Sequence, residues 1–184
     1  QQLPKLWELF HDFGMTTLEL NRREWLGSAA AAGAFVFGCP TGAAAQNAAP
    51  EVNAWVVIHP DDRVVIRIAR SEMGQGTLTG LAQLVAEELG CDWGKVTTEY
   101  PTPGDNLKRN RVWGNFSTGG SRGIRESHDY VRQGGAAARL MLVQAAANEW
   151  KVPAAECRAA AGVIAHATTN RRTSYGKVAA AAAR

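Results

Sequence analysis

The sequence has few of the residues that most often mark a metal site or a nucleic-acid partner. It contains four histidines and three cysteines in 184 residues. His59, His128 and His166 each lack a second ligand three or four positions away, so no metal constellation is visible, and each is interpreted as a surface or capping residue. The formal net charge of +3 is too small to indicate a nucleic-acid partner. The apolar run at residues 28–38 is too short and too rich in small residues to span a bilayer stably.

That apolar run belongs to a pattern typical of twin-arginine export signals. The motif NRREWLG at residues 21–27 precedes it, and a small-residue cleavage site, AAA, follows at residues 43–45. We therefore predict a signal peptide over residues 15–45, a linker over residues 46–52, and export to the periplasm. Residues 1–14 lie ahead of Met15, which is placed as a start for such a signal, and they are interpreted as extra sequence.

Removal of the signal would leave Cys91 and Cys157 as the remaining cysteines. In an exported chain these two could form a disulfide. One ends an amphipathic helical segment and the other follows a second one, so we interpret both as buried free thiols.

The motif SEMGQGT at residues 71–77 lies between an apolar strand pattern and an amphipathic helix pattern. Gly74 and Gly76 permit positive φ and a close approach of the backbone to a ligand, and Gln75 offers an amide between them. Thr77 can cap the following helix, whose first free N–H groups would point toward an anionic ligand. An ordinary strand-to-helix connection is the alternative.

A second loop about forty residues later has similar chemistry. It is rich in hydroxyls and glycine, and Thr118 or Ser121 could cap the long helix predicted to end near Trp150. Arg122 and Arg125 would lie in the first helical turn, where cations are unfavourable unless an anion is bound nearby. A solvated turn with exposed arginines is equally compatible with this loop alone. The basic run at residues 108–111 is interpreted as a solvated loop, with an anion-attracting rim as the alternative.

Periodicity predicts an α+β fold in which helices pack on a sheet. Residues 54–59 and 63–69 form a predicted hairpin, and residues 96–100 form a further strand. Helical spacing follows over residues 78–89 and again up to Trp150, with a weak point at Gly134 and Gly135, where each glycine costs about 1 kcal/mol relative to alanine. A short helix from Pro153, a strand at residues 161–166 and a final helix complete the prediction.

Together, the two loops resemble the molybdopterin-binding large subunit of the xanthine dehydrogenase and aldehyde oxidase family. The resemblance is to its periplasmic branch, the isoquinoline 1-oxidoreductase beta subunit and the large subunit of membrane-associated aldehyde dehydrogenases. It covers residues 53–183 and rests on SEMGQGT (71–77), LVAEEL (84–89), STGGSR (117–122) and RTSYGK (172–177). The resemblance implies molybdopterin as cofactor, in a dinucleotide form, and the following cofactor-binding residues: Gly74, Gln75, Gly76, Thr77, Ser117, Thr118, Gly119, Gly120, Ser121 and Arg122.

The resemblance also implies an activity and partners. A subunit of this kind oxidises an aldehyde or an N-heterocycle with oxygen derived from water and passes electrons to a small iron–sulfur subunit, with a cytochrome c subunit and peripheral membrane association as further expectations. The residues after the signal are too few for a complete large subunit, so we interpret 53–184 as part of a larger molybdopterin-binding domain. The catalytic base is expected beyond this sequence, and the chain alone is expected to be inactive. A truncated, non-catalytic exported domain that binds a nucleotide or a partner subunit is the alternative.

Overall fold

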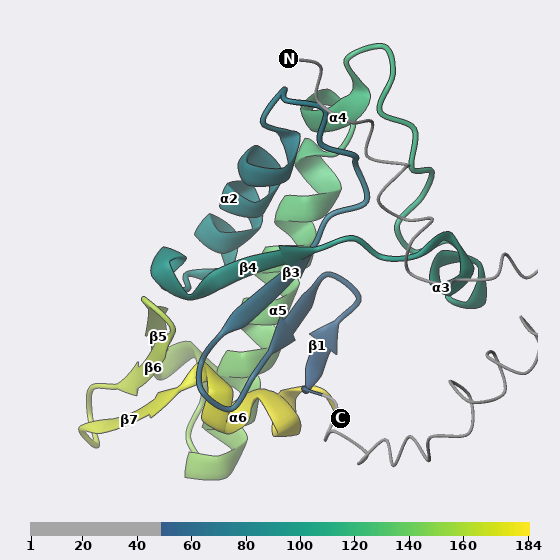
Figure 1. Ribbon diagram of the computed structural model, residues 1–184. Coiled ribbons are helices and arrows are strands. Elements are labelled where there is room, and N and C mark those ends of the chain that lie inside the picture. Colours follow the sequence, from purple (N-terminus) through teal and green to yellow (C-terminus); the bar gives the residue numbers. More distant parts are fainter. Residues whose placement is uncertain (1–48) are drawn as a thin grey trace, which may run out of the picture. The chain divides into compact units, whose positions relative to one another are not determined.

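The computed structural model describes residues 49–184, in which a mixed four-stranded sheet comes first (Figure 1). Its strand order is β1-β2-β3-β4. The first three strands are antiparallel, and β4 pairs parallel with β3. A parallel neighbour requires a crossover, and α2 supplies it between β3 and β4. The bounds of these elements are Glu51–Asn53 (β1), Val56–Ile58 (β2), Val64–Arg67 (β3), Thr77–Leu89 (α2) and Val96–Glu99 (β4).

A second, antiparallel sheet of order β5-β6-β7 follows the long helix α5. Within residues 49–184, no helix is both long and apolar enough to cross a membrane. The remaining elements are the helices α3 (Pro103–Lys108), α4 (Arg122–Arg125), α5 (His128–Trp150) and α6 (Tyr175–Ala182), the strands β5 (Cys157–Ala160), β6 (Val163–His166) and β7 (Arg171–Ser174), and the short 3₁₀ turns η2 (Trp93–Lys95) and η3 (Ala154–Glu156).

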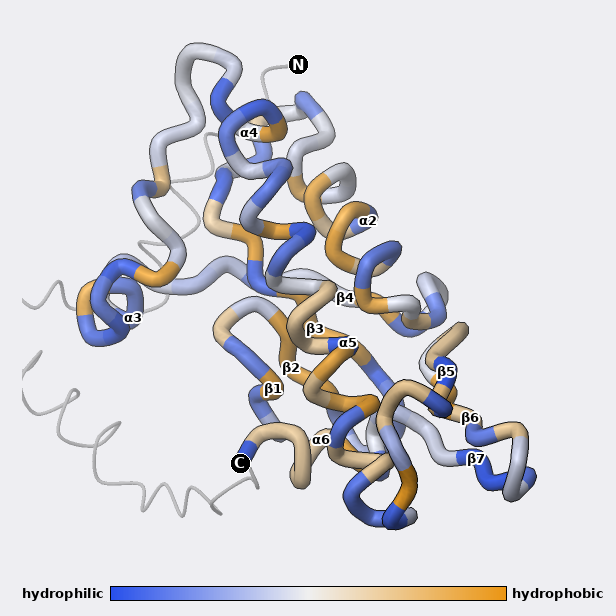
Figure 2. Tube along the Cα trace, turned by 180° about the vertical axis from the view of Figure 1, so that it is seen from behind, coloured by the Kyte–Doolittle hydropathy of each residue, from blue (hydrophilic) through white to orange (hydrophobic). Residues whose placement is uncertain are grey.

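The hydrophobic core lies between the first sheet and the helices α2 and α5. All three residues of β2 are buried, and β3 alternates between buried and partly exposed positions. Leu81, Val85 and Leu89 bring the apolar face of α2 into the same core. Figure 2 shows hydrophobic positions gathered along β2, β3 and α2. The predicted α+β class, the hairpin, α2 and β4 are confirmed.

The glycine pair in α5 does not interrupt the helix, and it has a packing role that was not predicted. The helix runs without interruption through Gly134 and Gly135. A Cβ on Gly135 would lie 2.5 Å from the carbonyl oxygen of Val85, and one on Gly134 would lie 2.8 Å from the Trp55 ring. The two glycines therefore allow α5 to approach α2 and β2 closely, and this packing outweighs their low helix propensity.

Other predictions were wrong in detail. The helix predicted up to Trp150 is divided into α4 and α5, because α4 ends at Arg125 and the buried Ser127 precedes α5. Helix α3 was not predicted; its first turn is capped by the Thr102 hydroxyl accepting from the Asp105 N–H at 3.0 Å, and it includes Lys108, the first residue of the run interpreted as a loop. Strands β5 and β7 were not predicted. Neither Thr77 nor Ser121 caps a helix through its side chain.

Candidate functional site

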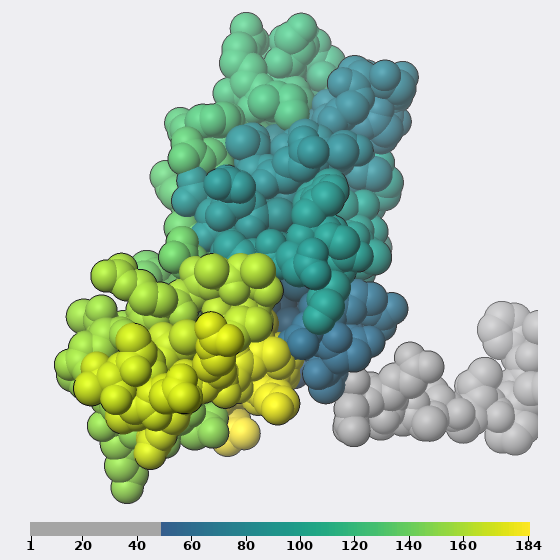
Figure 3. Space-filling view, turned by 90° about the vertical axis from the view of Figure 1, so that its left-hand side faces the viewer, coloured from purple at the N-terminus to yellow at the C-terminus, as the bar shows by residue number. Residues whose placement is uncertain are grey.

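The two loops singled out in the sequence line one pocket. Its volume is about 380 Å³. In Figures 1 and 3 the loop before α2 and the segment around α4 lie at the same end of the described part of the chain, away from β7 and α6. Of the predicted residues, Gly74, Gly76, Ser117 and Arg122 do not line the pocket. The lining residues are Met73, Gln75, Thr77, Thr118, Gly119, Gly120, Ser121, Gly123 and Ile124.

The first loop is closed by the carboxylate of Glu72. One of its oxygens accepts hydrogen bonds from the N–H groups of Gly74 (2.7 Å) and Gly76 (2.9 Å), and the other accepts from Leu78 (3.0 Å). Hydrogen bonds from the Leu78 and Gly76 N–H groups hold the pKa of Glu72 below the ordinary 4.5 of a glutamate. The N–H groups that were expected to face an external anion are therefore already bound to the protein's own carboxylate.

The side chain of Gln75 also forms hydrogen bonds within its own loop. Its side-chain oxygen accepts from the Met73 N–H at 2.5 Å, and its side-chain nitrogen donates to the Ser71 carbonyl at 2.8 Å. Gly76 adopts a left-handed conformation with φ 77° at the N-cap of α2. The amide of Gln75 thus lies on the pocket wall while it holds the turn in shape.

Arg70, which directly precedes the first loop, forms hydrogen bonds with the second loop. This residue is only 4% exposed. The guanidinium donates from Nε to the Ser127 hydroxyl at 2.9 Å and from Nη1 to the Asn115 side chain at 3.1 Å and to the Ser117 carbonyl. Next to it, the Ser71 N–H donates to the Thr118 hydroxyl at 3.0 Å. These contacts fix the two walls of the pocket relative to one another.

The arginines of the second loop have protein partners. Arg122 lies 3.4 Å from the Glu126 carboxylate, and Arg125 donates to the Gly120 carbonyl at 3.3 Å. Their position in the first turn of α4 is thus compatible with a structural role as well as with an anionic ligand. Ser121 is left-handed, with φ 59°, immediately before α4.

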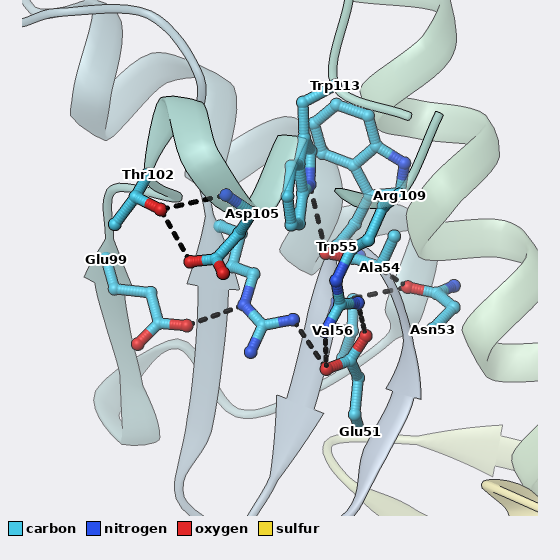
Figure 4. A network of polar contacts seen from close by, with 11 residues as sticks. Glu51, Asn53, Ala54, Trp55, Val56, Glu99, Thr102, Asp105, Arg109 and Trp113 are labelled. Atoms are coloured by element: carbon cyan, nitrogen blue, oxygen red, sulfur yellow. Dashed lines mark hydrogen bonds and ion pairs between the residues drawn. The ribbon is translucent and has the colours of Figure 1, made fainter. Parts of the chain in front are cut away.

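An aromatic and ionic network holds the segment that leads into the second loop against the sheet (Figure 4). The Trp113 indole donates to the Ala54 carbonyl at 3.0 Å, and the guanidiniums of Arg67 and Arg109 lie over its ring. Both arginines also pair with Glu51. Burial opposes ionisation of Glu51, but the hydrogen bonds from Arg109 and Arg67 outweigh it and lower its pKa. The interpretation of residues 108–111 as merely solvated was therefore wrong for Arg109.

Comparison with known proteins identifies the family of this domain. The sequence pattern of the molybdopterin cofactor-binding domain matches residues 11–184. The chain belongs to this family. The matched range also includes the segment interpreted as an export signal, which lies outside the described residues together with residues 1–14.

Two curated relatives of this molybdopterin-binding domain have the names that the resemblance predicted. The isoquinoline 1-oxidoreductase subunit beta of Brevundimonas diminuta is 36% identical over 89% of this chain and 22% of its own length. The membrane-bound aldehyde dehydrogenase [pyrroloquinoline-quinone] of Gluconacetobacter polyoxogenes is 32% identical over 71% of this chain and 16% of its own length. The chain therefore spans about a fifth of the length of these relatives.

Solved structures show the same fold at lower identity. Quinoline 2-oxidoreductase from Pseudomonas putida 86 and CO dehydrogenase from Oligotropha carboxidovorans each superpose with a TM-score of 0.52 at 21% identity. Each match covers 68% of this chain and 15% of the other chain.

The residues that line the pocket include an amide, hydroxyls and glycines, which fit a cofactor that brings its own metal ligands. The pterin dithiolene supplies the sulfur ligands of the metal, so the protein contributes backbone donors, amides and hydroxyls. A Cβ placed on Gly74, Gly76 or Gly119 would meet nothing within 4 Å, so the backbone of both loops is open to close approach. Within residues 49–184, no group of three or more His, Cys, Asp or Glu side chains is arranged to hold a metal ion.

The isolated cysteines and histidines lie away from this pocket. Cys91 and Cys157 are free thiols, and burial raises the pKa of Cys91 to about 11. His59 and His128 are partly exposed. The expectation for His166 was wrong, because it is 2% exposed and lies 2.9 Å from the Glu156 carboxylate and 2.8 Å from the Thr169 hydroxyl.

Sequence reasoning missed Arg70 and Glu72 as residues of the site. Both left a signal in the sequence. Arg70 is a charged residue directly after a β-branched run, which is unusual unless the side chain has buried partners. Glu72 is a carboxylate two residues before a glycine turn that opens a helix, where it can accept from free N–H groups.

Proposed function

We propose that this domain is part of the large subunit of a molybdenum hydroxylase that oxidises an aldehyde or an N-heterocycle. The names of the two curated relatives support this substrate class. The observation that carries the proposal is the convergence of two glycine-rich loops, distant in sequence, on one pocket in a molybdopterin-binding domain. Bound molybdopterin would supply the redox chemistry that inserts oxygen derived from water and takes up two electrons.

The residues of this chain would bind and orient the cofactor. The candidate binding residues are those of the two loops, namely Gly74 to Thr77 and Ser117 to Arg122. Gly119 would allow close backbone approach, and the hydroxyls of Thr118 and Ser121 would donate hydrogen bonds to polar groups of the ligand. Gln75 would present its amide from the opposite wall. Arg70 would keep the walls at a fixed separation.

Partners and location complete the proposal. One relative is named as a subunit, which supports a multi-subunit enzyme. We propose a small iron–sulfur subunit as the electron acceptor, with a cytochrome c subunit as a further carrier. The arginine pair at residues 22 and 23 supports export to the periplasm by the twin-arginine route, and the name of the other relative supports association with a membrane.

Substitution of Gly119 by valine tests the cofactor site. Gly119 lies outside the left-handed region and its Cβ position is open, so valine would fill space in the pocket without backbone strain. Steric misfit costs about 1–3 kcal/mol, which corresponds to roughly a five- to hundredfold loss of cofactor affinity. The chain is purified from a host that makes molybdopterin, and molybdenum and pterin are measured per chain beside the thermal unfolding temperature.

Gly104→Val is the matched control, because Gly104 is also an exposed glycine outside the left-handed region, with its nearest neighbour 3.8 Å from the Cβ position. Gly76 is less suitable because its φ of 77° would strain any side chain. Equal cofactor content in the Gly119 and Gly104 variants would contradict the proposal that this pocket binds the cofactor. Oxidation of aromatic aldehydes and N-heterocycles with a dye as electron acceptor, measured on a protein of the relatives' length that carries this domain, tests the activity separately.

A further inference from the structure

The carboxylate of Glu72 occupies the place in the first loop where an anionic ligand would be expected. A helix N-terminus presents free N–H groups and the positive end of the helix dipole. At the N-terminus of α2, three N–H groups donate to the Glu72 carboxylate over 2.7 to 3.0 Å. They belong to Gly74, Gly76 and Leu78. The Glu72 carboxylate of the protein itself is therefore the anion bound at this helix N-terminus.

The position of Glu72 is fixed from a second side. Its own N–H donates to the hydroxyl of Tyr100, the residue that follows β4, at 3.2 Å. The neighbouring Ser71 is tied to the second loop through Thr118. Glu72 thus connects the glycine turn to the sheet, and the turn keeps its open shape through contacts within the protein.

A negative charge at this position also changes where another anion can bind. Two like charges a few ångströms apart repel one another, and an incoming anion would have to displace a carboxylate that already holds three N–H groups. The N-terminus of α2 is therefore unfavourable for a second anion.

We infer that Glu72 is a positioning residue, which holds the glycine turn open for the cofactor and excludes external anions from the N-terminus of α2. This inference rests on the proposed function for its relevance to molybdopterin. The exclusion itself concerns only this chain and an anion, so it can be measured without the cofactor.

The test uses the full chain labelled with nitrogen-15, with inorganic pyrophosphate as the probe. In the wild type, pyrophosphate should leave the amide signals of Gly74, Gly76 and Leu78 in place. In Glu72→Ala the three N–H groups lose their acceptor and should donate to pyrophosphate instead, so the same three signals should shift on titration. Acetate, which restores a carboxylate, should return these signals toward their wild-type positions and suppress the pyrophosphate shifts.

Two further variants keep the result interpretable. Glu87→Ala removes an exposed carboxylate from the same helix and should behave like the wild type. Glu72→Gln retains the side-chain volume and one acceptor oxygen, and it should show pyrophosphate shifts even if the alanine variant folds poorly. Shifts at Gly74, Gly76 and Leu78 in the wild type, or their absence in both Glu72 variants, would overturn the inference. Neither result depends on molybdenum content, which tests the proposed function on its own.

Discussion

Arg70 shows how a single buried charge can organise a binding site. A guanidinium removed from water is tolerated only when its donors find acceptors, and Arg70 finds them in Ser127, Asn115 and the Ser117 carbonyl. All of these partners belong to the second loop or to the residue that precedes α5. Arg70 is therefore one of the residues that hold this loop in place, beside the hydrogen bonds from Ser71 to Thr118 and from Arg125 to Gly120.

Replacement of Arg70 by methionine should therefore be costly. It removes the hydrogen bonds from the guanidinium to the Ser117 carbonyl and to the Asn115 and Ser127 side chains. Hydrogen bonds to a charged group contribute about 1.5–3 kcal/mol. Arg70→Lys should recover only part of this loss, because an ammonium cannot reproduce the planar fork. The free energy of unfolding, measured with urea, checks both values.

The control for Arg70 is Arg132→Met, which breaks a half-exposed ion pair with Glu88. Exposed pairs of this kind contribute about 0–1 kcal/mol. If the Arg70 variant loses no more stability than the Arg132 variant, Arg70 does not have the role described above.

Helices α2 and α5 are the elements whose packing determines the shape of the molecule around the site. They approach closely at Gly135, where a Cβ would lie 2.5 Å from the backbone carbonyl of Val85. Backbone cannot move aside as a flexible side chain can. We therefore expect the glycine to be required by packing, although alanine is the better helix former.

Gly135→Ala should destabilise the domain by about 1–3 kcal/mol through overpacking, partly offset by about 1 kcal/mol of helix propensity. Gly104→Ala is the matched control, because that helical glycine has no neighbour closer than 3.8 Å and its replacement should be neutral or stabilising. Thermal unfolding of the two variants compares them directly. A Gly135 variant as stable as the Gly104 variant would mean that the two helices can separate at little cost.

The hairpin strands and α2, which sequence patterns predicted, have a regular apolar period. The strands around Val57 and Val65 and the helix at residues 78–89 repeat apolar residues at spacings of two or of three and four. Strands β5 and β7 have four residues each, and β7 begins with Arg171 and Arg172, so neither has a readable alternation. Their strand conformation comes from pairing with β6, which is a tertiary effect.

At the scale of the whole molecule, the candidate site depends on topology that a linear sequence does not display. The loops around Gln75 and Gly119 are far apart in the chain and meet because β3 and α5 place them at the same end (Figure 1). Their glycine and hydroxyl content could be recognised from sequence. The hydrogen bonds of the turn's N–H groups to Glu72, and the buried contacts of Arg70, depend on side-chain directions set by the fold, so the sequence signals of these two residues do not name their partners.

Delivery of the whole protein to the periplasm is the remaining prediction, and it concerns residues outside the described part of the chain. If Arg22 and Arg23 form a twin-arginine signal, replacing both with lysine should leave a reporter fused after Gln46 in the cytoplasm. The charge is unchanged, but lysine lacks the planar guanidinium that an arginine-specific translocase recognises. Cell fractionation measures the distribution of the reporter, and Glu24→Gln, which keeps both arginines, is the control. Periplasmic delivery of the double-lysine variant at the control's level would contradict the signal, and with it the proposed location.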